Sequence, residues 1–131
     1  KGDIETADQV QDAMGGRAIN IVGQTGLDDA IALISRCSLF ITNDSGLMHV
    51  AAALKVPTVA SFGSTDSIAT GPRGKNARIV KQDMECSPCL KPECTVGYRC
   101  LLAVQPEDVW KEMEELRRIA DSGDRPASSG A

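Results

Sequence analysis

The sequence is poor in the residues that nucleic-acid-binding and membrane proteins use. Aromatic residues make up only 3% of the 131 residues, so platforms on which nucleic-acid bases stack are not expected. The formal net charge is -4, and no cluster of lysine and arginine is long enough to form a basic stripe. No apolar run approaches the roughly 20 residues that a membrane-spanning helix needs. A single globular domain with one core, without a nucleic-acid partner, is therefore the simplest expectation.

Short apolar runs alternate with stretches of helical periodicity along the chain. Runs typical of buried strands occupy residues 18–22, 38–42, 58–62 and 77–81. Helical spacing of apolar residues occupies 4–14, 27–34, 47–54 and 106–120. This alternation predicts an α/β, Rossmann-like fold, with a parallel sheet covered by helices on both faces. We expect the domain to occupy residues 1–120, and the Gly- and Ser-rich stretch 121–131 to be a disordered tail.

Three small polar residues join the predicted strand 38–42 to the apolar helix 47–54. Asn43, Asp44 and Ser45 are all favourable helix N-caps, and capping alone would explain them. The turn also follows a parallel strand and precedes a helix, which is where open α/β sheets bind phosphate groups. Gly46 would let such a group approach the backbone closely. Helix capping and phosphate binding both remain open on these residues alone.

The helix that follows this turn is apolar on nearly every side except at His49, so we expect it to be buried. His49 is the sole histidine, and a lone histidine is commonly a hydrogen-bonded core residue. It lies one helical turn after Ser45, which also suits a ligand pocket. Thr65 and Asp66 follow the next predicted strand and should reach the same edge of the sheet.

Four of the five cysteines lie within one loop. They are Cys86, Cys89, Cys94 and Cys100. The loop has few large apolar residues, so we expect a metal or a covalent link to order it. A structural zinc is one hypothesis, although only Cys86 and Cys89 have the spacing of a zinc knuckle. Two disulfides or four free thiols are equally compatible with the spacing.

Two blocks of sequence resemble the donor-site signature of glycosyltransferase family 9, which contains the ADP-heptose:lipopolysaccharide heptosyltransferases. The first is Asn-Asp-Ser-Gly-Leu-Met-His at 43–49, followed by Ala-Ala-Ala-Leu at 51–54. The second is Pro-Thr-Val-Ala at 57–60, followed by Phe-Gly-Ser-Thr-Asp at 62–66. The resemblance implies two Rossmann-like domains of the GT-B type. This chain would be most of the second, donor-binding domain, with that domain's first strand and the N-terminal domain lying outside it.

The resemblance also implies a chemistry. An inverting enzyme would transfer heptose from ADP-heptose to the lipopolysaccharide inner core, without a cofactor required for catalysis. The donor would contact Asp44, Ser45, Gly46 and His49, with Asp44 beside the sugar. Further donor contacts are expected at Asn43, Thr65, Asp66 and Glu5, although for Glu5 an ordinary place in the first turn of a helix is the stronger interpretation.

No catalytic residue is expected in this chain, because the base and the lipopolysaccharide acceptor site would belong to the other domain. Such an enzyme would lie in the cytoplasm, with peripheral contact at the inner membrane at most. The alternative interpretation is a non-catalytic α/β binding module stapled by a metal in the cysteine loop.

Overall fold

The computed structural model describes residues 2–122. The chain divides between Leu33 and Ile34 into two compact units, which are described separately. The predicted tail at 123–131 lies outside the described residues. None of the described helices is long and apolar enough to cross a membrane.

The first unit begins with helix α1 (Gly2–Ala13), which the apolar spacing predicted. Two glycines follow the helix and allow the backbone to turn away from it. Gly15 and Gly16 have φ angles of 64° and 72°, which residues with a side chain rarely adopt. The Gly16 N–H donates to the Gln11 carbonyl at 3.1 Å, and the Gly15 N–H donates to the Asp12 carbonyl at 2.9 Å. This pair of bonds is a Schellman motif, which ends the helix.

The strand predicted at 18–22 is wrong, because these residues are irregular. Asn20 explains the difference. Its Oδ1 accepts a hydrogen bond from the Val22 N–H at 3.1 Å, and its amide donates to Asp8 at 2.8 Å. These local bonds compete with a strand, and no described strand pairs with this segment. Ile19 remains 89% exposed as a result. Helix α2 (Leu27–Ser35) follows and continues past the division between the units.

The second unit contains a parallel three-stranded sheet in the order β1-β2-β3, which confirms the other three predicted strands. The strands are β1 (Phe40–Asn43), β2 (Thr58–Ser61) and β3 (Ala77–Val80). Their register pairs Phe40 with Thr58 and Asn43 with Ser61. The strands β1 and β2 therefore end together, and the turns that follow them leave the same edge of the sheet.

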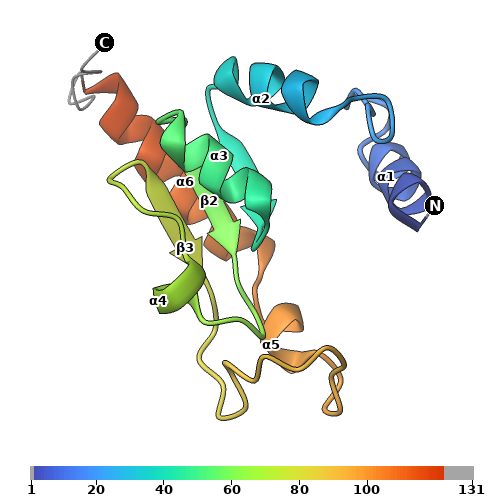
Figure 1. Cartoon of the computed structure of the whole chain (residues 1–131), viewed down its shortest axis with the longest axis vertical. Coiled ribbons are helices and arrows are strands. Elements are labelled where there is room, and N and C mark those ends of the chain that lie inside the picture. The colour runs from blue at the N-terminus through green and yellow to red at the C-terminus, as the bar shows by residue number, and fades with distance from the viewer. Residues whose placement is uncertain (1, 123–131) are drawn as a thin grey trace. The chain divides into compact units, whose positions relative to one another are not determined.

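Helices α3 (Gly46–Ala53) and α6 (Pro106–Asp121) cover opposite faces of this sheet (Figure 1). Successive strand residues point to opposite faces, and two of the core clusters illustrate that rule. Ala60 packs with Met48 of α3, whereas its neighbour Val59 packs with Leu116 of α6. The helix α6 begins at Pro106 as predicted. It ends at Asp121 with Ser122 as its C-cap, slightly beyond the predicted domain boundary at residue 120.

Helix α3 is less buried than its composition predicted. Met48 and Ala51 are fully buried, but His49 and Ala53 are exposed. An apolar helix can leave one side in water when that side carries alanines, because their exposure costs little. Two short helices, α4 (Ser67–Thr70) and α5 (Arg99–Leu102), were not predicted. Each has only four residues, too few for a periodic pattern.

Candidate functional site

The turn between β1 and α3 leaves the start of the helix without a side-chain cap. Ser45 occupies the N-cap position with extended backbone angles (φ -152°, ψ 165°), but its side chain makes no capping bond. Its hydroxyl lies 3.2 Å from the hydroxyl of Thr42 instead. Helix capping, one of the two interpretations of this turn, is therefore not what these side chains do. The positive end of the α3 dipole remains available to an external acceptor.

Gly46, the first residue of α3, faces open space. No described atom lies within 4 Å of the place where its Cβ would be, so packing does not require a glycine there. Backbone conformation does not require one either, because Gly46 is absent from the residues with positive φ. A glycine needed by neither packing nor conformation leaves the first turn of α3 bare, which is what close approach of a ligand needs.

His49 is exposed on α3, one turn beyond Ser45. The interpretation of His49 as a buried, hydrogen-bonded core residue is therefore wrong. Asp44 is half-buried, and its Oδ2 lies 3.5 Å from the hydroxyl of Thr70. The turn thus places a half-buried carboxylate beside a helix N-terminus at one edge of the sheet, and an exposed histidine follows one turn further along α3.

The second predicted turn meets the first through Thr70 of α4. The Thr70 hydroxyl donates to the Asp66 carbonyl at 2.9 Å and also reaches Asp44. The structure thus brings together two segments that are 26 residues apart. The Asp66 side chain also has a local role, which its place after β2 did not predict. Its Oδ1 caps α4 by accepting from the N–H groups of Ile68 at 2.9 Å and Ala69 at 3.4 Å.

Three further residues were predicted to contact the donor. Asn43 is exposed at the end of β1, and Thr65 is half-buried beside Asp66. Glu5 lies on α1 in the first unit, where its side chain is exposed. Its contact with a ligand stays a prediction. Thr70 was missed, and the available signal was weak: an Asp in N-cap position followed by a hydroxyl residue four positions later.

The structure does not assemble the predicted metal site. Among residues 2–122, no group of three His, Cys, Asp or Glu side chains could hold a metal ion, and the four cysteines of the loop form no disulfide. Cys100 is buried in α5, where a Cβ on Gly63 would lie 3.4 Å from its sulfur, whereas Cys86 is exposed. The four thiols as arranged do not fit a zinc ion, which needs its ligands to converge.

Hydrogen bonds link this loop to the segment that follows β2. The backbone N–H groups of Cys89 and Leu90 both donate to the Ser64 carbonyl at 3.0 Å. The Ser87 hydroxyl donates to the Gly63 carbonyl. The loop is thereby attached to the segment that follows β2.

Cys94 lies in a tight turn of this loop. Backbone hydrogen bonds, from Val96 first and then Tyr98, lower the pKa of the Cys94 thiol. The Tyr98 N–H lies 3.0 Å from the Cys94 sulfur.

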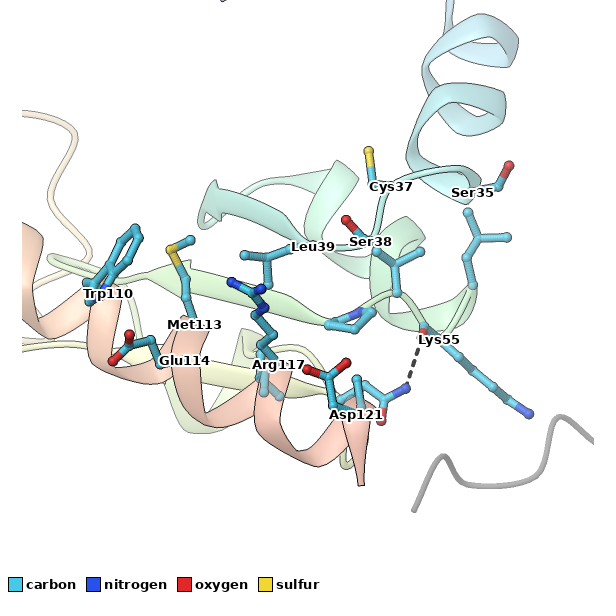
Figure 2. Close-up of a pocket in the computed structure, with 16 residues that line it drawn as sticks. Ser35, Cys37, Ser38, Leu39, Lys55, Trp110, Met113, Glu114, Arg117 and Asp121 are labelled. Atoms are coloured by element: carbon cyan, nitrogen blue, oxygen red, sulfur yellow. Dashed lines mark hydrogen bonds between the residues drawn. The ribbon is translucent and has the colours of Figure 1, made fainter. Parts of the chain in front are cut away.

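A cavity of about 920 Å³ lies at the opposite end of the strands from the polar turns. Figure 2 shows that Trp110, Met113 and Arg117 of α6 line it across from Leu39, which precedes β1. The Lys55 carbonyl at its margin accepts a hydrogen bond from Asn76 at 2.9 Å. None of the predicted site residues lines this cavity. Ligands of open parallel sheets bind at the carboxyl ends of the strands, so the polar turns, rather than this cavity, are the candidate site.

Comparison with known proteins decides the family. The family model described as glycosyltransferase family 9 (heptosyltransferase) matches residues 1–122. The chain belongs to glycosyltransferase family 9. The resemblance found in the two sequence blocks is thereby confirmed.

The relatives of this family-9 chain include heptosyltransferases from several bacteria. It is 37% identical over 99 residues to lipooligosaccharide heptosyltransferase 2 of Campylobacter jejuni, covering 74% of this chain and 31% of that protein. It is 39% identical over 98 residues to lipopolysaccharide heptosyltransferase 2 of Escherichia coli, covering 74% of this chain and 28% of that protein. The chain thus spans about a third of the length of these relatives.

A solved structure supports the same assignment. The structure of E. coli ADP-heptose lps heptosyltransferase II matches this family-9 chain with a TM-score of 0.72 and 29% identity. The match covers 92% of this chain and 35% of the other. The predicted α/β, Rossmann-like fold is confirmed. The alternative of a metal-stapled binding module gains no support from the relatives or from the arrangement of the thiols.

Proposed function

We propose that this chain forms the donor-binding part of an inverting heptosyltransferase that transfers heptose from ADP-heptose to the lipopolysaccharide inner core. The observation that carries the proposal is the uncapped start of α3 at the carboxyl end of β1, with an open Gly46. A diphosphate needs N–H donors and positive potential, and this helix end offers both. The names of the relatives supply the heptose and the lipopolysaccharide.

The leaving group explains why such a site matters to the reaction. The acceptor hydroxyl attacks the anomeric carbon, and the bond between that carbon and the diphosphate oxygen breaks. The electron pair of that bond leaves with ADP, so negative charge develops on the diphosphate. Donors that are already oriented toward this charge stabilise the transition state more than the ground state.

Asp44 is suited to the sugar rather than to the phosphates. A carboxylate next to a diphosphate would be repelled, but a carboxylate accepts hydrogen bonds from sugar hydroxyls well. Its half-buried position beside α3 would set it next to a heptose attached to a diphosphate at Gly46. His49, exposed one turn along the same helix, would border the donor rather than act as the base.

The rest of the reaction requires residues outside this chain. We propose that a second domain of the GT-B type provides the catalytic base and the lipopolysaccharide acceptor site, and that no cofactor is needed for the chemistry. The reaction would take place in the cytoplasm at the inner membrane, with peripheral contact at most. Glu5 and Thr65 are proposed as further donor contacts.

Calorimetry and a transfer assay test this function. The full-length protein that contains this sequence should bind ADP and should transfer heptose from ADP-heptose to lipopolysaccharide that lacks its inner-core heptose. UDP at the same concentration serves as the matched control for nucleotide identity. Absence of both ADP binding and heptose transfer in a folded full-length protein would refute the proposal.

A further inference from the structure

The hydroxyl of Thr70 stands between the two polar turns of the candidate site. Its oxygen is 2.9 Å from the carbonyl oxygen of Asp66 and 3.5 Å from Oδ2 of Asp44. The first distance is normal for an O–H···O hydrogen bond, whereas the second is longer than that range and makes a weaker contact. One hydroxyl proton thus has two acceptors, one fixed in the backbone and one on a side chain.

The backbone that carries Thr70 is held closely. Asp66 caps the start of α4, and the Thr70 N–H donates to the Asp66 carbonyl at 2.9 Å. At the other end of α4, Gly71 leaves no room for a side chain. A Cβ there would lie 2.2 Å from the Ser67 carbonyl oxygen and 2.7 Å from Cδ1 of Ile79. This packing presents the Thr70 hydroxyl from a fixed position.

The Asp44 carboxylate, by contrast, has little else to orient it. None of the ion pairs in residues 2–122 includes Asp44. The contact with Thr70 is the hydrogen bond that the described structure gives its side chain. A half-buried carboxylate whose position depends on one hydroxyl should respond directly to the removal of that hydroxyl.

We propose that Thr70 is a positioning residue that orients the Asp44 carboxylate toward the hydroxyl groups of the donor sugar. The inference rests on the proposed function, because it assumes that Asp44 contacts the sugar of a nucleotide-sugar donor. Thr70 itself touches Asp44 and the backbone of α4, so it acts through Asp44. Loss of its hydroxyl should therefore weaken recognition of the sugar and leave recognition of ADP unchanged.

The experiment compares Thr70→Val with Thr70→Ser in the full-length protein. Valine has nearly the same shape as threonine without the hydroxyl, whereas serine retains it. We expect Thr70→Val to weaken ADP-heptose binding by about 3- to 10-fold, the size of one modest hydrogen bond. Thr70→Ser should restore most of that affinity. The affinity for ADP should be the same in all three proteins.

A double-mutant cycle with Asp44→Ala tests whether Thr70 acts through Asp44. In the Asp44→Ala protein, Thr70→Val should have no further effect on ADP-heptose affinity. Ser122→Ala is the matched control, because the Ser122 hydroxyl also donates to a helix carbonyl, that of Ile119, at the end of α6. Thermal unfolding of each variant shows whether it is folded.

The outcomes separate this inference from the proposed function. If Asp44→Ala weakens ADP-heptose binding but Thr70→Val does not, or if their effects simply add, the positioning role is refuted and the donor site stands. Equal loss of ADP and ADP-heptose affinity in Thr70→Val would also refute it, because a general structural role would then explain the result. If the unaltered protein binds neither ADP nor ADP-heptose, the proposed function itself fails.

Discussion

The position of the donor diphosphate can be tested at Gly46, because a substitution there should change ligand binding without changing the fold. Replacing Gly46 by Val puts a branched side chain at the first residue of α3, into space that no described atom occupies within 4 Å. The fold should therefore tolerate the change. In a helix glycine is intrinsically worse than valine by a few tenths of a kcal/mol, so the free energy of unfolding should stay the same or rise slightly.

The effect on binding should be much larger than the effect on stability. A diphosphate at the start of α3 would accept charge-assisted hydrogen bonds from N–H groups, each worth about 1.5–3 kcal/mol. The valine side chain would keep the phosphate from reaching at least one of them. We therefore expect the affinity for ADP to fall at least tenfold, which corresponds to about 1.4 kcal/mol.

Calorimetric titration of the full-length protein with ADP measures this change, and thermal unfolding checks the fold. Ala53→Val is the matched control, because Ala53 is exposed at the other end of the same helix. It should leave ADP affinity unchanged. Unaltered ADP affinity in a folded Gly46→Val protein would show that the diphosphate binds elsewhere.

Three other predictions follow from the second unit and from the cysteine loop. Gly71→Ala should destabilise the second unit by about 2 kcal/mol in thermal or urea unfolding, because the added Cβ would lie 2.2 Å from the backbone oxygen of Ser67. Gly26→Ala is the control, because its added Cβ would lie no closer than 3.8 Å to any described atom beyond its chain neighbours. The 131-residue chain alone should show no heptose transfer, since donor and acceptor must be brought together by two domains, and product formation by it would contradict the proposed division of labour. Elemental analysis and thiol titration after oxygen-free purification should find no zinc and the four thiols of the cysteine loop reduced. One zinc per chain would restore the metal hypothesis and show that the loop rearranges around the ion.

The sequence predicted most of the second unit because its strands and long helix are determined locally. The segment from Thr58 to Ser61 consists mainly of strand formers, is buried at three of its four positions and pairs on both sides. The helix α6 has Pro106 at its start, and the Asp108 side chain accepts from the Gln105 N–H at 3.0 Å, so its beginning is marked in the sequence. The segment 18–22 has a similar composition, but a strand also needs a partner, and composition does not reveal one.

In the polar turns, too, composition did not predict which contact each side chain makes. Asn43, Asp44 and Ser45 were recognised as residues that suit a helix start, yet propensity does not tell whether a side chain makes the capping bond. Ser45 instead contacts Thr42, whereas the Asp66 side chain caps α4, a helix too short to be predicted.

The contact between Asp44 and Thr70 depends on sheet register, which is a tertiary property. Because Asn43 pairs with Ser61, the chain leaves β1 and β2 at the same level, and the two turns begin side by side. The short helix α4 then carries Thr70 back toward Asp44, and Gly71 allows the close packing against Ser67 and Ile79 that holds this return. Each residue in this arrangement is ordinary in its own local sequence. The connection between them arises only when the parallel register brings the ends of the two strands together, so a site of this kind has to be inferred from structure rather than from motif spacing.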